Sequence, residues 1–152
     1  MNQWMQIAYN EATEGMLAND GGPFGAVIVK DNKIISQAHN EVLKSNDPTA
    51  HAEINAIRKA SKALDNFDLS GCTIYTTCKP CPMCLGAIFW ARIETVYFGA
   101  TDIDASKAGF DDKHFYEMLK EEDSGLILKQ IDKKENAELF ELWLQKSDRE
   151  MY

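Results

Sequence analysis

The sequence predicts a single α/β domain in which helices cover both faces of a five-stranded mixed sheet, a three-layer α/β/α arrangement. Segments rich in β-branched residues alternate with segments in which apolar residues recur at helical spacing. Because single helices separate most of these strands, crossover connections are expected to make much of the sheet parallel. The chain has 152 residues, 45% of them hydrophobic, with no repeat, low-complexity tract or linker. Residues 1–152 are therefore expected to form one domain.

The N-terminal part of the chain predicts a helix followed by a β-hairpin. Apolar residues recur at helical spacing through residues 1–16, and a segment with two glycines and a proline then ends the helix. Two apolar, β-branched segments follow on either side of a polar turn. The hairpin strands are expected over residues 25–30 and 34–39.

Helices and strands alternate through the rest of the chain. A helix is expected directly after the loop that ends at Thr49, and Pro80 separates the next strand from the next helix. Apolar residues of the last helix gather on one face. The expected helices are residues 51–64, 81–91, 113–121 and a final helix that carries Leu139, Phe140, Trp143 and Leu144, and the expected strands are residues 72–77, 95–100 and 126–131.

Charge and hydropathy exclude several classes of partner. Sixteen Lys and Arg against 24 Asp and Glu give a net charge of −8, so the field of the chain repels phosphate backbones and anionic membranes. No apolar run approaches the roughly 18 residues that a membrane span needs, and the N-terminus does not read as a secretory signal. We expect a cytoplasmic protein that binds neither nucleic acid nor membranes as its principal partner.

Two short motifs at predicted helix starts carry the chemistry. His51-x-Glu53 comes first, and Pro80-Cys81-x-x-Cys84 follows downstream. This order and spacing is the signature of zinc-dependent base deaminases. The two thiolates and the imidazole would hold one zinc ion per subunit and leave its fourth position to a water, whose pKa the metal lowers toward neutrality.

The other nearby acid and thiols have different predicted roles. Glu53 is poorly placed to be a ligand on the same helical face as His51 and well placed to transfer protons from the water to a substrate ring. The alternative is a closed, noncatalytic zinc site in which Cys78 is the fourth protein ligand. Cys72, on a strand, is expected to be a small buried apolar side chain.

At these motifs the chain resembles the cytidine-deaminase-like superfamily, and more closely its purine-acting branch, which contains guanine deaminases and tRNA adenosine deaminases. The similarity to bacterial guanine deaminases is the stronger. It is carried by residues 21–30, 45–53 and 81–88, and residues 108–112 and the terminal Tyr152 extend it. The chain departs from the pattern at Lys79, where relatives commonly have Glu.

The resemblance implies roles for further residues. Asn40 would hydrogen-bond the purine, and the backbone of Ala52 would help to hold its edge. Asp112 would contact the exocyclic amine or assist its departure. The remaining implied residues are Phe24 and Trp90 around the ring and Tyr152 closing the site. Members of this branch form dimers, and in bacterial guanine deaminases the C-terminal segment is exchanged between subunits. The resemblance therefore implies that Tyr152 would act in the partner's site.

Each implied role has a structural alternative in the sequence. Asn40 suits a loop turn, and Asp112 suits the cap of the next helix. Phe24 and Trp90 suit a core, and Tyr152 is a chain end, where disorder is common.

The function that these observations favour is hydrolytic deamination of guanine to xanthine and ammonia. The nearest alternative is deamination of adenosine in tRNA, and deamination of guanosine or another aminated heterocycle is a second, because the zinc core does not itself choose the ring. A noncatalytic zinc-binding module is the alternative of another class.

Overall fold

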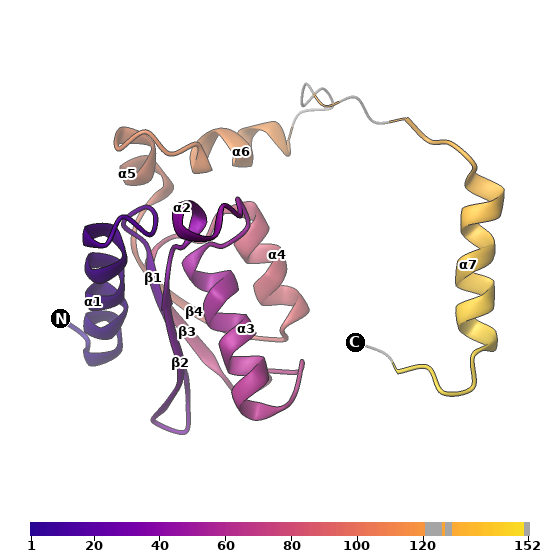
Figure 1. Ribbon diagram of the computed structural model, residues 1–152, viewed down its shortest axis with the longest axis horizontal. Helices are drawn as coiled ribbons and strands as arrows, with labels where there is room; N and C mark the ends of the chain where they lie inside the picture. Colours follow the sequence, from indigo (N-terminus) through magenta and orange to yellow (C-terminus); the bar gives the residue numbers. More distant parts are fainter. Residues whose placement is uncertain (121–125, 127–128, 151–152) are drawn as a thin grey trace.

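The computed structural model describes residues 1–120, 126 and 129–150 of the chain (Figure 1). Helices and strands alternate from the N-terminus much as the sequence predicts. The short helices α2 and α5 were not predicted. The elements are α1 (Gln3–Leu17), β1 (Gly25–Lys30), β2 (Lys33–His39), α2 (Val42–Ser45), α3 (Ala52–Leu64), β3 (Thr73–Cys78), α4 (Pro82–Trp90), β4 (Thr95–Ala100), α5 (Asp102–Lys107), α6 (Asp112–Met118) and α7 (Lys133–Gln145).

The sheet is mixed, in the strand order β2-β1-β3-β4. The prediction that much of it is parallel is wrong, because only β3 and β4 run parallel, whereas β1 is antiparallel to both β2 and β3. The physical reason lies in the hairpin. The crossover from β2 through α3 passes over β1 before β3 joins the sheet, so β3 pairs with the hairpin strand that runs the opposite way.

The sheet has four strands in the described part of the chain, not the predicted five. The missing strand was expected over residues 126–131, of which 127 and 128 lie outside the described residues. The described residues of this stretch are not in a strand, and Leu126 and Ile131 are exposed. An apolar, β-branched segment predicts the local preference for a strand but not whether the segment reaches the sheet.

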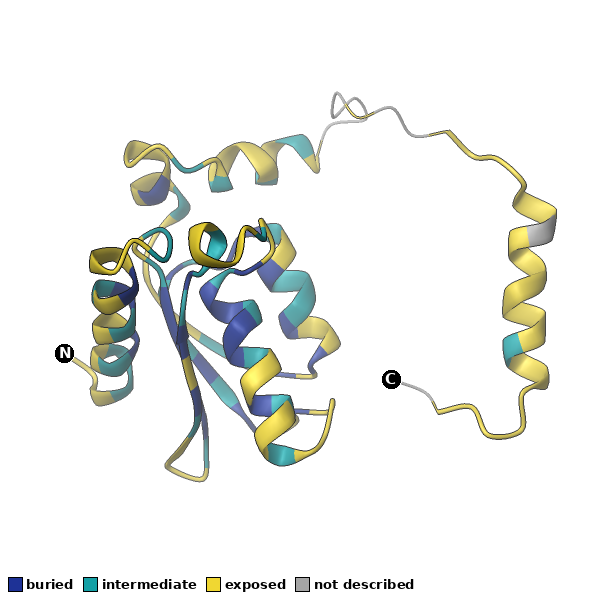
Figure 2. Ribbon diagram, in the orientation of Figure 1, coloured by how far each residue is buried: buried dark blue, intermediate teal, exposed yellow. Residues whose placement is uncertain are grey.

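Helices cover both faces of the sheet, which confirms the three-layer α/β/α prediction. On one face, α1 packs through Ala8 against Val27 and Val29. On the other face, α3 and α4 pack against the alternate strand residues, among them Ala26, Ile28 and Ile74. Figure 2 shows the buried residues concentrated along the strands and on the sides of the helices that face them. No helix in the described ranges is long and apolar enough to cross a membrane.

The candidate site lies at the end of the domain where the N-termini of α3 and α4 meet the short helix α6. The N-termini of α3 and α4 lie side by side where β3 ends, and α6 lies above them, whereas α5 lies above α1 (Figure 1). Helix α6 contacts α4, and α5 contacts α6. The fold therefore places the first turns of α3 and α4 beneath α6, which α5 adjoins.

Helix α7 extends away from this body (Figure 1). The sequence correctly predicted a helix here with one apolar face. Most of that face is exposed to solvent, since Leu139, Phe140 and Leu144 each have at least 58% of their surface accessible, whereas Trp143 is partly buried. Burial of apolar residues on one stripe is what normally stabilises such a helix.

Candidate active site

His51 and Cys81 occupy matching positions at the starts of two adjacent helices. Each is the N-cap of its helix, with an extended backbone, and Pro82 follows Cys81 as the first residue of α4. Cys84 lies in the first turn of α4, on the same side as Cys81. Because helix N-termini carry unpaired backbone N–H groups, they favour thiolate over thiol at this point.

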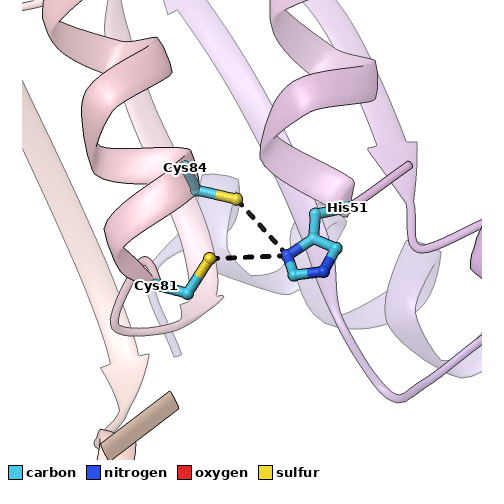
Figure 3. A group of neighbouring side chains, drawn as sticks. All are labelled: His51, Cys81 and Cys84. Carbon is cyan, nitrogen blue, oxygen red and sulfur yellow. Dashed lines mark hydrogen bonds between the residues drawn. The ribbon is translucent and has the colours of Figure 1, made fainter. Parts of the chain in front are cut away.

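The three side chains converge on a space that fits one metal ion. His51 Nδ1 lies 3.6 Å from Cys81 Sγ and 3.5 Å from Cys84 Sγ (Figure 3). The ligand atoms of this group all lie within 4.8 Å of one another. One imidazole nitrogen and two sulfurs match the ligand set of a catalytic zinc with an open fourth position. Cys78, the fourth ligand of the alternative closed site, is not part of this group among the described residues.

The electrostatic interactions among these three side chains show how closely they are coupled. The hydrogen bond from Cys84 lowers the pKa of Cys81 to about 4, and the hydrogen bond and charge of His51 act in the same direction. The same thiolate raises the pKa of Cys84, whose burial adds to the effect. The pKa of His51 is raised, chiefly by its hydrogen bond to Cys81. One sulfur is thus already a thiolate at neutral pH, in the form that binds zinc.

Glu53 is a buried carboxyl group directly beside the metal ligands. Its Oε1 accepts a hydrogen bond of 3.1 Å from Thr76 Oγ1 on β3, and its Oε2 lies 3.4 Å from Cys84 Sγ. Burial raises the pKa of Glu53. Only 6% of the residue is accessible. A carboxyl group with a raised pKa, held at the base of a cavity, is suited to accept and return a proton.

A cavity of about 360 Å³ opens above these groups. Its aromatic part is formed by Phe24 and Phe110, whose rings meet edge to face with centroids 4.8 Å apart. This volume is sufficient for a single flat heterocycle. The lining residues are Gly21, Gly22, Phe24, Asn40, Val42, Leu43, Pro48, His51, Glu53, Cys78, Lys79, Phe110 and Asp112.

Asn40 lines the cavity and also holds a turn. The residue is buried, its Oδ1 accepts a 3.1 Å hydrogen bond from the backbone N–H of Val42, and its own backbone N–H donates to the carbonyl of Phe24. A Cβ atom at Gly21 would lie only 2.0 Å from Asn40 Oδ1. The backbone of Gly21 therefore packs closely against the Asn40 amide and restricts its position at the cavity wall.

Asp112 lies at the first position of α6, half-buried over the same cavity. Its pKa is raised, first by burial and then by the charge of Cys81. The alternative cap role is not supported, since the N-cap position belongs to Asp111, which makes no side-chain cap hydrogen bond. Ala52, the first residue of α3, is fully buried and presents its backbone at the start of the helix.

Trp90, a predicted site residue, is not brought to this cavity. Trp90 ends α4 and lines a separate cavity of about 600 Å³ with Ile54 and Ile57. Since α4 has nine residues, its two ends are separated by roughly 13 Å, which keeps Trp90 away from Cys81. Tyr152 lies outside the described residues.

The sequence reasoning missed Phe110, Pro48 and Lys79 as lining residues. Phe110 stands inside the segment 108–112 that carried the resemblance, so its signal was present. The sequence marks Lys79 only as a departure from the family pattern. Its contacts with later helices cannot be read from sequence spacing. Cys78 also lines the cavity, where burial raises its pKa to about 11 and its thiol donates to the carbonyl of Thr101.

Comparison with known proteins identifies the family. The sequence profile of the zinc-binding region of cytidine and deoxycytidylate deaminases matches residues 1–100. The chain belongs to this family. It is therefore a hydrolase that acts on C–N bonds, and zinc is its cofactor. His51, Cys81 and Cys84 form the candidate site for this zinc. The predicted resemblance is confirmed.

Relatives of this zinc deaminase include purine- and tRNA-acting members. The chain is 46% identical to guanine deaminase of Bacillus subtilis over 98% of its length and 97% of that protein. It is 42% identical to the tRNA-specific adenosine deaminase of Buchnera aphidicola over 77% of each chain.

Solved structures agree with these relationships. The crystal structure of the Bacillus subtilis guanine deaminase superposes with a TM-score of 0.94, covering 100% of this chain and 99% of that one. A variant of the protein NE0047 in complex with 8-azaguanine, 32% identical, covers 72% of this chain and 63% of that one with a TM-score of 0.68. The fold class is confirmed by the first of these over the whole chain.

Proposed function

We propose that this chain is a guanine deaminase, which hydrolyses guanine to xanthine and ammonia in purine metabolism. The observation that carries the proposal is the similarity to the Bacillus subtilis enzyme, which extends from end to end in sequence and in structure. The cavity supports it, because its aromatic lining and volume suit a flat ring.

Binding would use the walls of the cavity. Phe24 contacts one edge of the ring, next to Phe110, and Asn40 hydrogen-bonds to its polar edge. The backbone at Ala52 holds the opposite edge. These contacts would orient C2, the carbon that bears the amino group, toward the three ligand residues.

The reaction replaces the amino group at C2 with the oxygen of water. His51, Cys81 and Cys84 would hold zinc, which would lower the pKa of a water bound there. Glu53 would accept a proton from the attacking water and pass it to the ring nitrogen beside C2. It would then move the proton of the new C2 hydroxyl to the amine, so that the carbonyl forms as the C–N bond breaks and ammonia leaves. Asp112, facing the same cavity, assists the departure of ammonia.

The alternative of tRNA deamination is less well supported. A tRNA-acting enzyme must contact a phosphate backbone, whereas this chain has a net charge of −8. The matched tRNA-specific deaminase also leaves part of this chain uncovered. Lys79 is the one Lys or Arg among the described residues that line the cavity, and it faces Asp102.

A substrate panel tests the proposal. Ammonia release by the purified zinc-loaded protein is measured with guanine, guanosine, adenine, cytosine, cytidine and a tRNA anticodon hairpin. Guanine is expected to give the highest kcat/KM. Faster turnover of guanosine or of the hairpin would replace guanine as the assigned substrate, and no turnover of any of them would favour a noncatalytic zinc module.

We further propose a cytoplasmic homodimer of one-domain chains that exchange their C-terminal segments. The exposed apolar face of α7 would be costly to leave in water, and the outer edge of β4 carries exposed Tyr97 and Phe98. Glu150, near the chain end, reaches the cavity between α3 and α4. None of the four cysteines forms a disulfide, as suits a reducing compartment.

Mixing two inactive variants tests the exchange. We expect Tyr152 to act in the partner's site, so a Glu53→Ala chain supplies an intact Tyr152 to the site of a chain that lacks Tyr152. Co-refolding the two variants should restore up to one active site in each mixed dimer. Activity no higher than the sum of the separate variants would contradict the exchange.

A further inference from the structure

We propose that Lys79 is a positioning residue that fastens α5 and α6 over the active site and thereby places Phe110 and Asp112. The residue lies between β3 and α4, two positions before Cys81. Its Nζ lies 3.5 Å from Asp102 Oδ1 and 4.4 Å from the centroid of the Tyr116 ring. One ammonium group therefore contacts the first residue of α5 and the middle of α6.

Neighbouring contacts show that the same loop also holds the rest of the segment from α5 to α6, which we call the cover. The backbone N–H of Lys79 donates a 2.8 Å hydrogen bond to the carbonyl of Ala100, at the end of β4. The hydroxyl of Tyr116 donates a 2.5 Å hydrogen bond to the carbonyl of Pro80. The Cys78 thiol donates to the carbonyl of Thr101. Residues 78–80 thus hold both ends of the cover.

Apolar burial contributes little to holding these helices down. In α5 only Ala105 is buried, and α6 has no buried residue. Elements with few buried apolar contacts open most readily. The Lys79 contacts are in contrast partly shielded, since the side chains of Lys79 and Asp102 are 37% and 19% exposed. A charge held between a carboxylate and an aromatic face is favourable in such a setting.

The cover contributes two groups to the cavity. Phe110, between α5 and α6, packs edge to face on Phe24, and Asp112 begins α6. Both lie within a few residues of the elements that Lys79 contacts. This inference rests on the proposed function for its kinetic part, because the role assigned to Asp112 is departure of the amine from guanine.

The test compares charge removal, conservation and reversal at Lys79. Lys79→Gln and Lys79→Glu are expected to speed amide hydrogen exchange of residues 102–118 about tenfold in the zinc-loaded protein without substrate, and to lower kcat/KM for guanine by about tenfold, mostly through KM. Lys79→Arg should stay close to the wild type, because it keeps a cation that can lie over Tyr116. Zinc content and exchange in α3 should not change.

A double-mutant cycle isolates the ion pair from other effects of the substitutions. Asp102→Lys alone should open the cover, and Lys79→Glu combined with Asp102→Lys should recover at least half of the lost protection and kcat/KM. Lys113→Gln is the matched control. Lys113 lies on α6 and forms an exposed pair with Glu117 of the same helix, so its loss should change neither measurement.

The outcomes separate the two proposals. Unchanged exchange in both Lys79→Gln and Lys79→Glu would overturn the fastening role, and so would loss of zinc with no change in the cover. Faster exchange with unchanged kinetics would overturn positioning of the cavity groups. If the wild-type protein fails to deaminate guanine, the proposed function fails, but the exchange measurement still decides whether Lys79 holds the cover.

Discussion

Glu53 is buried, and its hydrogen bonds hold it beside the residues that would bind the metal. Thr76 and Cys84 fix its two oxygens, so removing the carboxylate changes proton transfer without changing the ligand set. Glu53→Ala should retain zinc and lose kcat by about 10³-fold. Metal analysis and ammonia release on the same sample check this. Glu53→Gln is the control for shape, and substantial turnover by either variant would contradict the proton-transfer role.

Substitution of Gly21 tests the proposed role of Asn40 in binding guanine. A Cβ atom there would press on Asn40 Oδ1, and the Asn40 amide would have to move. We expect Gly21→Ala to raise KM for guanine by about tenfold, with a smaller change in kcat. Steady-state kinetics measure this. Gly86→Ala on α4 is the control, because no atom lies within 4 Å of its added Cβ and the substitution suits a helix. Equal kinetics for the two variants would remove the assigned role of Asn40.

The site residues that could be predicted from the sequence are those whose relative positions are determined by local spacing. His51, Glu53, Cys81 and Cys84 each lie in the first turn or at the cap of a helix, so two short motifs fix their relative positions. Trp90 shares a helix with Cys84 but lies at its other end, which residue type alone does not reveal. The contacts of Lys79 with α5 and α6 depend on how distant elements fold back on one another.

Secondary structure was predictable for the same reason, and sheet pairing was not. The hairpin β1–β2 and helices α3 and α4 follow from periodicity and from breakers such as Pro80. The order of strands depends on which edge β3 joins, and the pattern of its residues is the same on either side. The short helices α2 and α5 have too few residues to show a period.

Helix α7 provides a test at the scale of an element. If its apolar face is covered by a second chain, Phe140→Glu should shift the protein from dimer to monomer, because a charge at an apolar contact is costly to bury. Light scattering after size-exclusion chromatography measures the mass directly. Lys134→Glu is the matched control, since it adds negative charge to the polar side of the same helix. A dimer that survives Phe140→Glu would exclude this face from the interface.

For the whole molecule, zinc bound by His51 at the start of α3 and by Cys81 and Cys84 at the start of α4 would tie together two helices that lie on the same face of the sheet. Zinc at about 1,000 times its Kd stabilises the native state by about 4 kcal/mol, which for a domain of this size corresponds to a loss of roughly 10 °C in Tm when it is removed. Thermal unfolding before and after chelation measures the change. Readdition of zinc is the control for irreversible damage, and an unchanged Tm would place the metal outside the folded core.

The three ligands and Glu53 all lie before residue 85, whereas α7 belongs to the last twenty residues of the chain. During synthesis, the sheet and both ligand-bearing helices leave the ribosome while the C-terminal segment is still being translated. The metal centre can therefore assemble within one nascent chain, and the proposed pairing through α7 would be a later, bimolecular event. At low expression the cell would then contain metal-loaded single chains awaiting a partner, and dilution would limit the activity of the enzyme before loss of its metal does.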